Sequence, residues 1–115
     1  MEIKIFVVKT EIEHNEKALT LLNAEKINLV NLFNGLTIIP NCLGYWINEK
    51  GIIETDKVEI WLIDVQKDLI EITAHEYTKT EVIFLKMPIA RKFYQILSNI
   101  QKATYQKCQY HTLTP

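Results

Sequence analysis

Apolar residues recur along this chain with two different periods, and the order of those periods limits its possible folds more than any other feature. In some segments every second residue is apolar, as in a β-strand. In others the apolar residues recur every three or four positions, as on one side of an α-helix. We therefore predict strands at Glu2–Lys9, Leu36–Ile47, Lys57–Val65 and Glu81–Met87, and helices at Asn15–Phe33, Gln66–Thr80 and Ala90–Cys108. Either Asn15 or Asn23 could cap the start of the first helix, and Asn34-Gly35 is expected to end it.

The predicted elements follow the order β-α-β-β-α-β, with one more helix at the end. This is the order of the ferredoxin-like fold, in which the second strand lies at a sheet edge. Pro40 fits that position, because proline is tolerated in strands only at edges or bulges. We therefore expect an α+β chain: a ferredoxin-like βαββαβ unit with a four-stranded antiparallel sheet over residues 1–88, and an additional C-terminal helix. Residues 89–115 would form this basic amphipathic helix and a fraying tail (109–115), all within the same domain. The apolar face of the helix would consist of Phe93, Ile96, Leu97, Ile100 and Ala103.

The segment 66–80 has two possible assignments. Leu69, Ile72 and Tyr77 form a workable helical stripe, whereas Ile70, Ile72 and Ala74 alternate as they would in a strand. The helix fits the element order better, and it is the assignment that we predict here.

The length of the chain, its cysteines and its charge limit the kind of protein that it can be. A chain of 115 residues is the size of one domain. Cys42 and Cys108 are far apart and have no ligand-like spacing, so we expect two reduced thiols in a reducing compartment. No run approaches the roughly 18 apolar residues of a membrane span, so we expect a cytoplasmic protein without a membrane partner. The net charge is −6 over residues 1–85 and +5 over residues 86–115. The basic C-terminal part could dock on the acidic body, or it could bind nucleic acid.

Several strands carry large apolar residues on both faces, which are Phe6, Ile39, Trp61, Ile63 and Phe84. Two helices of a ferredoxin-like fold cover only one face of the sheet. The second face then needs a cover, because monomers rarely expose large apolar patches. The third helix or a second copy of the chain could supply it, and we expect a homo-oligomer that associates through this open sheet face.

The stretch Gly35-Leu36-Thr37-Ile38-Ile39, followed by Gly44-Tyr45-Trp46, by Gly51 and by the strand at 58–65, resembles a family of small uncharacterised bacterial and phage proteins. That family carries a Gly-Leu-Thr-Val strand, a Gly-x-Trp hairpin and a turn with glycine. The resemblance covers roughly residues 35–87. It implies a ferredoxin-like fold and no particular activity.

Aromatic residues near the predicted hairpin are the first candidates for a binding site. The segment from Asn48 to Gly51 is predicted to be the turn of this hairpin. Tyr45, Trp46 and Trp61 could approach one another if residues 45–47 pair with residues 52–61. Such rings can form a core or interface cluster, line a small-molecule pocket, or stack on bases. The ligand-binding candidates are therefore Thr37, Tyr45, Trp46, Asn48, Asp56 and Trp61.

Other groups of residues give weaker support for a function. Arg91, Lys92, Lys102 and Lys107 on the last helix could contact phosphates, which makes a nucleic-acid-associated protein the alternative function. A hydrolase that uses Glu54, Asp56 and Glu59 ranks last. No histidine pair has metal-ligand spacing and no nucleotide motif is present, so we predict no metal, cofactor or catalytic residue. The expected function is a non-enzymatic binding or assembly module.

Overall fold

The computed structural model describes the backbone of residues 1–74, 81–105 and 109–113, and the side chains of residues 1–72 and 85–105. It shows an α+β fold, which confirms the predicted class. The elements are β1 (Glu2–Val8), α1 (Glu16–Phe33), β2 (Thr37–Ile47), β3 (Ile53–Asp64), a 3-10 turn (Lys67–Leu69), β4 (Ile70–Ala74), β5 (Glu81–Leu85), α2 (Ile89–Ala103) and β6 (Gln109–Leu113).

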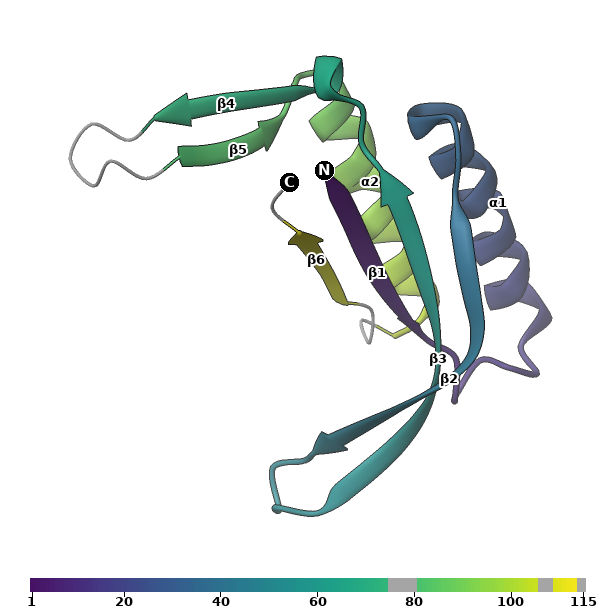
Figure 1. Cartoon of the computed structure of the whole chain (residues 1–115). Helices are drawn as coiled ribbons and strands as arrows, with labels where there is room; N and C mark the ends of the chain where they lie inside the picture. Colours follow the sequence, from purple (N-terminus) through teal and green to yellow (C-terminus); the bar gives the residue numbers. More distant parts are fainter. Residues whose placement is uncertain (75–80, 106–108, 114–115) are drawn as a thin grey trace.

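Four of the strands form the main sheet in the order β2-β3-β1-β6, and each neighbouring pair is antiparallel (Figure 1). β1 is therefore central, as the apolar residues on both of its faces predicted. The register places Ile5 opposite Trp61 and Ile3 opposite Ile63. β2 lies at one edge of the sheet, where the sequence placed it on the basis of Pro40.

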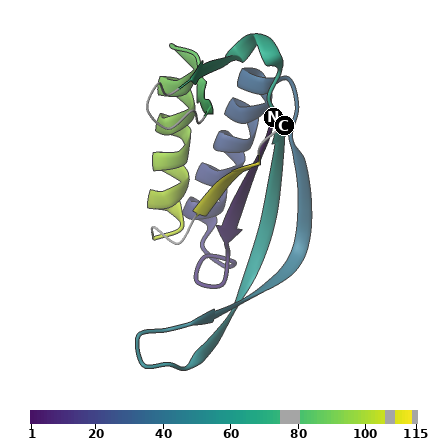
Figure 2. The same cartoon turned by 60° about the vertical axis from the view of Figure 1, so that its left-hand side comes forward.

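Both helices pack on the same face of the main sheet, so the domain has two layers (Figure 2). The core lies between these layers and combines alternate residues of β1 and β3 with one stripe from each helix. Phe33 of α1 and Phe93 of α2 meet edge to face, with their ring centroids 5.6 Å apart. The alternating apolar residues of the strands and the apolar stripes of the helices thus lie in one common core, as an amphipathic two-layer fold requires.

Polar residues set both ends of α1, and the helix starts after Asn15, the earlier of the two N-caps that the sequence allowed. The Oδ1 atom of Asn15 accepts a hydrogen bond from the backbone N–H of Ala18 at 3.1 Å, which is an N-cap. At the other end Asn34 adopts a left-handed conformation (φ 63°) and donates its backbone N–H to the carbonyl oxygen of Val30. These two caps fix α1 at 18 residues.

The helix predicted over residues 66–80 is wrong. Of the described residues 66–74, only Lys67–Leu69 form a helical turn, and Ile70–Ala74 form β4. Residues 75–80 lie outside the described part of the chain. The strand predicted over 81–87 does form, as β5, but it pairs with β4 in a separate two-stranded sheet. The β-branched residues Ile70, Ile72 and Thr73 favour this extended form, because they lose side-chain freedom in a helix.

The C-terminal part belongs to the two-layer fold itself, contrary to the prediction of an extra helix and a frayed tail. α2 occupies the place beside α1 that was assigned to the helix at 66–80, and Gln109–Leu113 form β6, which pairs with β1. The last helix therefore does not cover the second face of the sheet. Its predicted apolar stripe is confirmed, since Phe93, Ile96, Leu97, Ile100 and Ala103 are all buried.

Within the described residues, no helix combines the length and the apolar character needed to cross a membrane.

Candidate functional site: an exposed hairpin arm

The distal halves of β2 and β3 project beyond the two-layer body as a two-stranded ribbon (Figures 1 and 2). We define the arm as residues 42–58, in which Cys42–Ile47 pair with Ile53–Val58 across a turn. Figure 2 shows the arm extending past the ends of both helices and curving away from the main sheet. A two-stranded ribbon of this kind has little stability of its own in water, so the body must hold it at its base.

A β-bulge at Pro40–Asn41 begins the arm. The pairing of β2 with β3 is regular up to Ile39 and resumes at Cys42 with a shifted register. Asn41 adopts a left-handed conformation, with φ of 57°. An inserted residue of this kind bends the strand and increases its twist, which explains why the arm leaves the plane of the sheet.

Asn48 holds the turn at the tip of the arm. Its Oδ1 atom accepts hydrogen bonds from the backbone N–H groups of Lys50 and Ile52, at 2.9 and 3.0 Å. Its Nδ2 atom donates to Glu54 at 3.0 Å. Gly51 adopts φ of +75°, which is the left-handed residue that closes a three-residue hairpin loop. Both polar atoms of the Asn48 side chain thus make hydrogen bonds within the hairpin.

One face of the arm is a row of exposed apolar side chains. Leu43, Tyr45 and Ile47 of β2 alternate onto this face, and Ile53 lies opposite Ile47. Their exposed fractions run from 60 % for Leu43 to 74 % for Ile47. Isolated exposed apolar residues are common, but a contiguous row on a protruding ribbon is typical of an interaction surface.

The opposite face of the arm carries Trp46, which lies across Gly44. A Cβ atom added at Gly44 would come within 2.6 Å of the indole ring, so only glycine leaves room for this position of the ring. Trp46 remains 37 % exposed, and Ile52 beside the turn is 58 % exposed. The Gly-x-Trp pattern thus folds an aromatic side chain back onto its own strand, on the face of the arm that also carries the carboxylates of Glu54 and Asp56.

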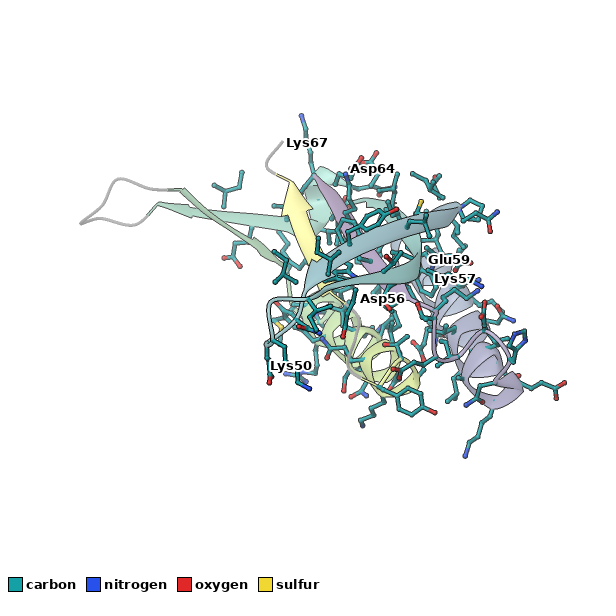
Figure 3. The ribbon with its side chains drawn as sticks, turned by 90° about the horizontal axis from the view of Figure 1, so that it is seen from below. Lys50, Asp56, Lys57, Glu59, Asp64 and Lys67 are labelled. Carbon is teal, nitrogen blue, oxygen red and sulfur yellow. The ribbon has the colours of Figure 1, made fainter. Side chains whose placement is uncertain are left out.

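Lys57 anchors the base of the arm to the body. Its Nζ atom lies 2.7 Å from Oε2 of Glu13, and its backbone N–H donates to the hydroxyl oxygen of Thr10 at 2.8 Å. The hydrogen bond from Lys57 lowers the pKa of the Glu13 carboxyl. Figure 3 shows Lys57 and Glu59 close together at this base, with Lys50 at the far tip. The direction of the arm is therefore fixed where it leaves the sheet.

Glu59 is the centre of a second polar cluster under the base of the arm. Lys9 lies 3.1 Å and Lys26 3.8 Å from its carboxylate oxygens, and the indole N–H of Trp61 donates to Oε1 at 3.1 Å. Burial would raise the pKa of Glu59, but the hydrogen bonds from Trp61 and Lys9 and the charge of Lys26 lower it below its ordinary value. The carboxylate is therefore ionised and fully paired.

A cleft of about 370 Å³ lies beside this cluster. It is lined by Lys9, Glu13, Asn41, Cys42, Leu43, Lys57, Val58 and Glu59. Cys42 is a free thiol, as predicted. Cys108 lies outside the described residues. The carboxylates of the cleft are already paired with its lysines, so the cleft shows no charge that requires a ligand.

The six predicted ligand-binding residues do not form one site. Tyr45, Trp46 and Asn48 lie together on the arm, and Asp56 lies opposite Gly44 nearer the base. Thr37 begins β2, eight residues from Tyr45, which is roughly 26 Å along a strand.

Trp61 is fully buried in the core. It lies seven residues along β3 from the partner of Trp46, which is roughly 23 Å. The three aromatic rings are therefore not brought together.

The alternative site on the last helix is only partly described. Arg91, Lys92 and Lys102 are exposed on α2, and Lys107 lies outside the described residues. Arg91 and Lys102 are eleven residues apart and share one side of the helix. The first turn of α2 contains no acidic residue.

The three carboxylates of the hydrolase hypothesis point to different sides of β3. Glu54 and Asp56 are on the face of Trp46, and Glu54 accepts a hydrogen bond from Asn48. Glu59 lies on the helix side of the strand with its lysines. They therefore do not form a shared acid–base pair.

The sequence reasoning missed four apolar residues of the arm, which are Leu43, Ile47, Ile52 and Ile53. A signal for them was present, because residues 34–48 contain no Asp, Glu, Lys or Arg. An uncharged stretch of that length in an edge strand is unusual, since edge strands commonly carry charges that prevent pairing.

The chain matches no protein-family model and no curated protein sequence.

Proposed function

We propose that this chain is a non-enzymatic assembly module whose arm binds a second copy of the same chain. The observation that carries this proposal is the row of exposed apolar side chains on the protruding arm. The row on this face of the arm contains no charged side chain from Leu43 to Ile47, and complete burial of one such apolar side chain contributes roughly 1.5–3 kcal/mol. Contact between two arms supplies a favourable driving force without any catalytic group.

The arm is a better contact surface than the open face of the main sheet. That open face mixes charged residues such as Glu2, Lys4 and Asp64 with apolar residues such as Ile60 and Leu62 that are already partly buried. Like charges from a second copy would meet there, and their desolvation is costly. The arm offers a larger exposed apolar area, so we place the homo-oligomer contact on it.

The cleft at the base of the arm is the place for a small molecule, if the module takes one. Its position between Lys9, Cys42 and Glu59 would couple occupancy to the direction of the arm. This part of the proposal is secondary, because the residues of the cleft pair with one another.

Sedimentation velocity of the whole chain tests the proposed function. We expect a concentration-dependent equilibrium at micromolar concentrations between the 13.5 kDa monomer and a species of twice that mass. A single 13.5 kDa species up to the highest concentration that stays clear of aggregation would contradict the proposal.

A second candidate function is binding to nucleic acid through α2. What supports it is the placement of Arg91 and Lys92 in the first turn of the helix, where positive charge is unfavourable for the helix dipole. Such residues are easier to explain if they meet phosphates. This function requires binding to generic duplex DNA or RNA that weakens as salt is raised, and no binding at low ionic strength would exclude it.

The proposed module has a ferredoxin-like architecture with an inserted hairpin. What supports this is the strand order β2-β3-β1-β6 with α1 following β1 and α2 preceding β6, which is a split βαβ arrangement interrupted by β4 and β5. The resemblance of residues 35–87 to small bacterial and phage proteins, and the cytoplasmic location, stay predictions alongside it.

A further inference from the structure

The outer edge of β2 in the arm offers unpaired backbone groups at alternate residues. Asn48 donates its backbone N–H to Ile52 across the turn, so the backbone of Asn48 faces β3. In an antiparallel pair the N–H and C=O groups of successive residues point to opposite sides of the strand. The backbone groups of Leu43, Tyr45 and Ile47 therefore point outward, away from β3, at the edge where the sheet order places β2.

The two edges of the arm differ in charge. The β3 side carries Glu54, Asp56 and Lys57, which are typical of an edge that avoids pairing. The β2 side carries no charged residue from Cys42 to Asn48. An uncharged, apolar edge strand accepts another extended strand readily, because no charge must be buried when the hydrogen bonds form.

We infer that two copies of the chain pair through this edge, β2 against β2, in an antiparallel register with Tyr45 opposite Tyr45 on a two-fold axis. The inference rests on the proposed function and specifies its contact. Leu43 of each copy then lies opposite Ile47 of the other. An antiparallel strand pair is self-complementary about a two-fold axis, so the same edge serves both copies.

This register pairs more of the outward backbone groups than the two registers that are shifted by one step along the strand. It pairs Leu43, Tyr45 and Ile47 only with one another, and these pairs would exchange about six hydrogen bonds. A shift of the axis to Gly44 brings Asn41 of the bulge opposite Ile47. A shift toward the tip brings Glu49 of the turn opposite Leu43. Each shift therefore loses a pair and places irregular backbone in the contact.

The side chains agree with this register. Leu43, Tyr45 and Ile47 lie on one face of the arm, so the pairing joins the rows of both copies into one apolar surface. On the other face Gly44 of each copy lies opposite Trp46 of the other, and the indole ring of each chain lies over its own Gly44. Cross-strand pairs of aromatic and branched apolar residues are among the favourable ones.

Disulfide cross-linking tests the register. In a background with Cys42→Ser and Cys108→Ser, we would introduce Tyr45→Cys, Leu43→Cys and Ile47→Cys one at a time and oxidise mildly. Two Tyr45→Cys chains would bring their Cα atoms to about 5.5 Å, within the range of a disulfide. We expect cross-linked dimer from Tyr45→Cys at a yield at least about ten times that of Ile47→Cys, whose Cα atoms would be roughly 13 Å apart along the strands.

A mixing experiment supplies the positive control. Leu43→Cys and Ile47→Cys each alone should give little dimer, whereas an equimolar mixture should give the mixed disulfide. If the background protein sediments as a dimer but Tyr45→Cys does not cross-link, the register is wrong and the proposed function stands. If the background protein is monomeric, the proposed function and the register both fail.

Discussion

Replacing Tyr45 with aspartate should turn the associated protein into a monomer without unfolding it. The substitution puts two carboxylates opposite each other on the proposed two-fold axis, about 5.5 Å apart between Cα atoms. Like charges at that distance repel by about 1–3 kcal/mol, depending on how well water screens them. The tyrosine contact is lost as well, so we expect a loss of about 3 kcal/mol or more, which weakens association more than about 100-fold.

Thr55→Asp is the matched control for Tyr45→Asp. Thr55 lies directly opposite Tyr45 on the same face of the arm, but its outward backbone groups belong to the charged β3 edge. The same charge is added to the same ribbon, one strand further from the axis, where salt screens it. Sedimentation should show the Thr55→Asp protein still associated. If both variants dissociate equally, the contact is not the β2 edge.

The folding stability of the Tyr45→Asp variant must be measured as well as its association. Tyr45 is 67 % exposed in the single chain, so its replacement removes little folding energy. The urea midpoint of the variant should match that of wild type measured at a concentration at which wild type is monomeric. A large fall in that midpoint would mean that the substitution acts through unfolding and not through the contact.

The second large effect is expected at Trp61. Its ring is fully buried against the helices, its N–H is bonded to Glu59, and the Nζ atom of Lys26 lies 5.5 Å from the ring centroid. Trp61→Ala should lower the free energy of unfolding by about 3–5 kcal/mol, through lost burial and the cavity that remains. That is a large part of the 5–15 kcal/mol that stabilises a typical domain.

Trp46→Ala is the matched control, since it removes the same side chain from the arm. Trp46 contacts Gly44 of its own strand and is partly exposed, so we expect a loss of less than about 1 kcal/mol. Both substitutions are best made in the Tyr45→Asp background, because association would otherwise add to the apparent stability. Equal urea midpoints for the two alanine variants would contradict the assignment of Trp61 to the core.

The fold could be predicted where local signals agreed with one another. Asn15 and Asn34 cap α1 at its predicted ends, and the stripe from Phe93 to Ala103 gave the buried face of α2. Asn48 and Gly51 marked the turn of the hairpin. At the start of α1 the sequence left Asn15 and Asn23 as two possible N-caps, and the structure selects Asn15.

Other parts depend on tertiary pairing that periodicity alone does not specify. Ile70–Ala74 satisfied both a helical and a strand period, and pairing with Glu81–Leu85 decided between them. The strand Gln109–Leu113 has no strong apolar alternation, and its pairing with β1 makes it part of the sheet. Because of these errors the last helix was predicted to be an addition, whereas α2 is a helix of the core.

The candidate site was predicted only in part. Tyr45 and Trp46 were chosen correctly as residues of one hairpin, but Trp61 was grouped with them because strand register could not be read from sequence. The bulge at Pro40–Asn41 shifts that register and bends the arm. The prediction was based on aromatic rings and did not use the absence of charged residues along the β2 edge. That uncharged edge forms the proposed contact between two copies.

Backbone amide hydrogen exchange on the whole protein tests the central claim most directly. In a single chain the outward amides of Leu43, Tyr45 and Ile47 on one edge and of Ile53 and Thr55 on the other all face solvent. Pairing of β2 with β2 should slow exchange at Leu43, Tyr45 and Ile47 by at least about tenfold relative to Ile53 and Thr55. Tyr45→Asp should abolish the difference. Equally fast exchange on both edges, under conditions in which the protein is associated, would contradict the account.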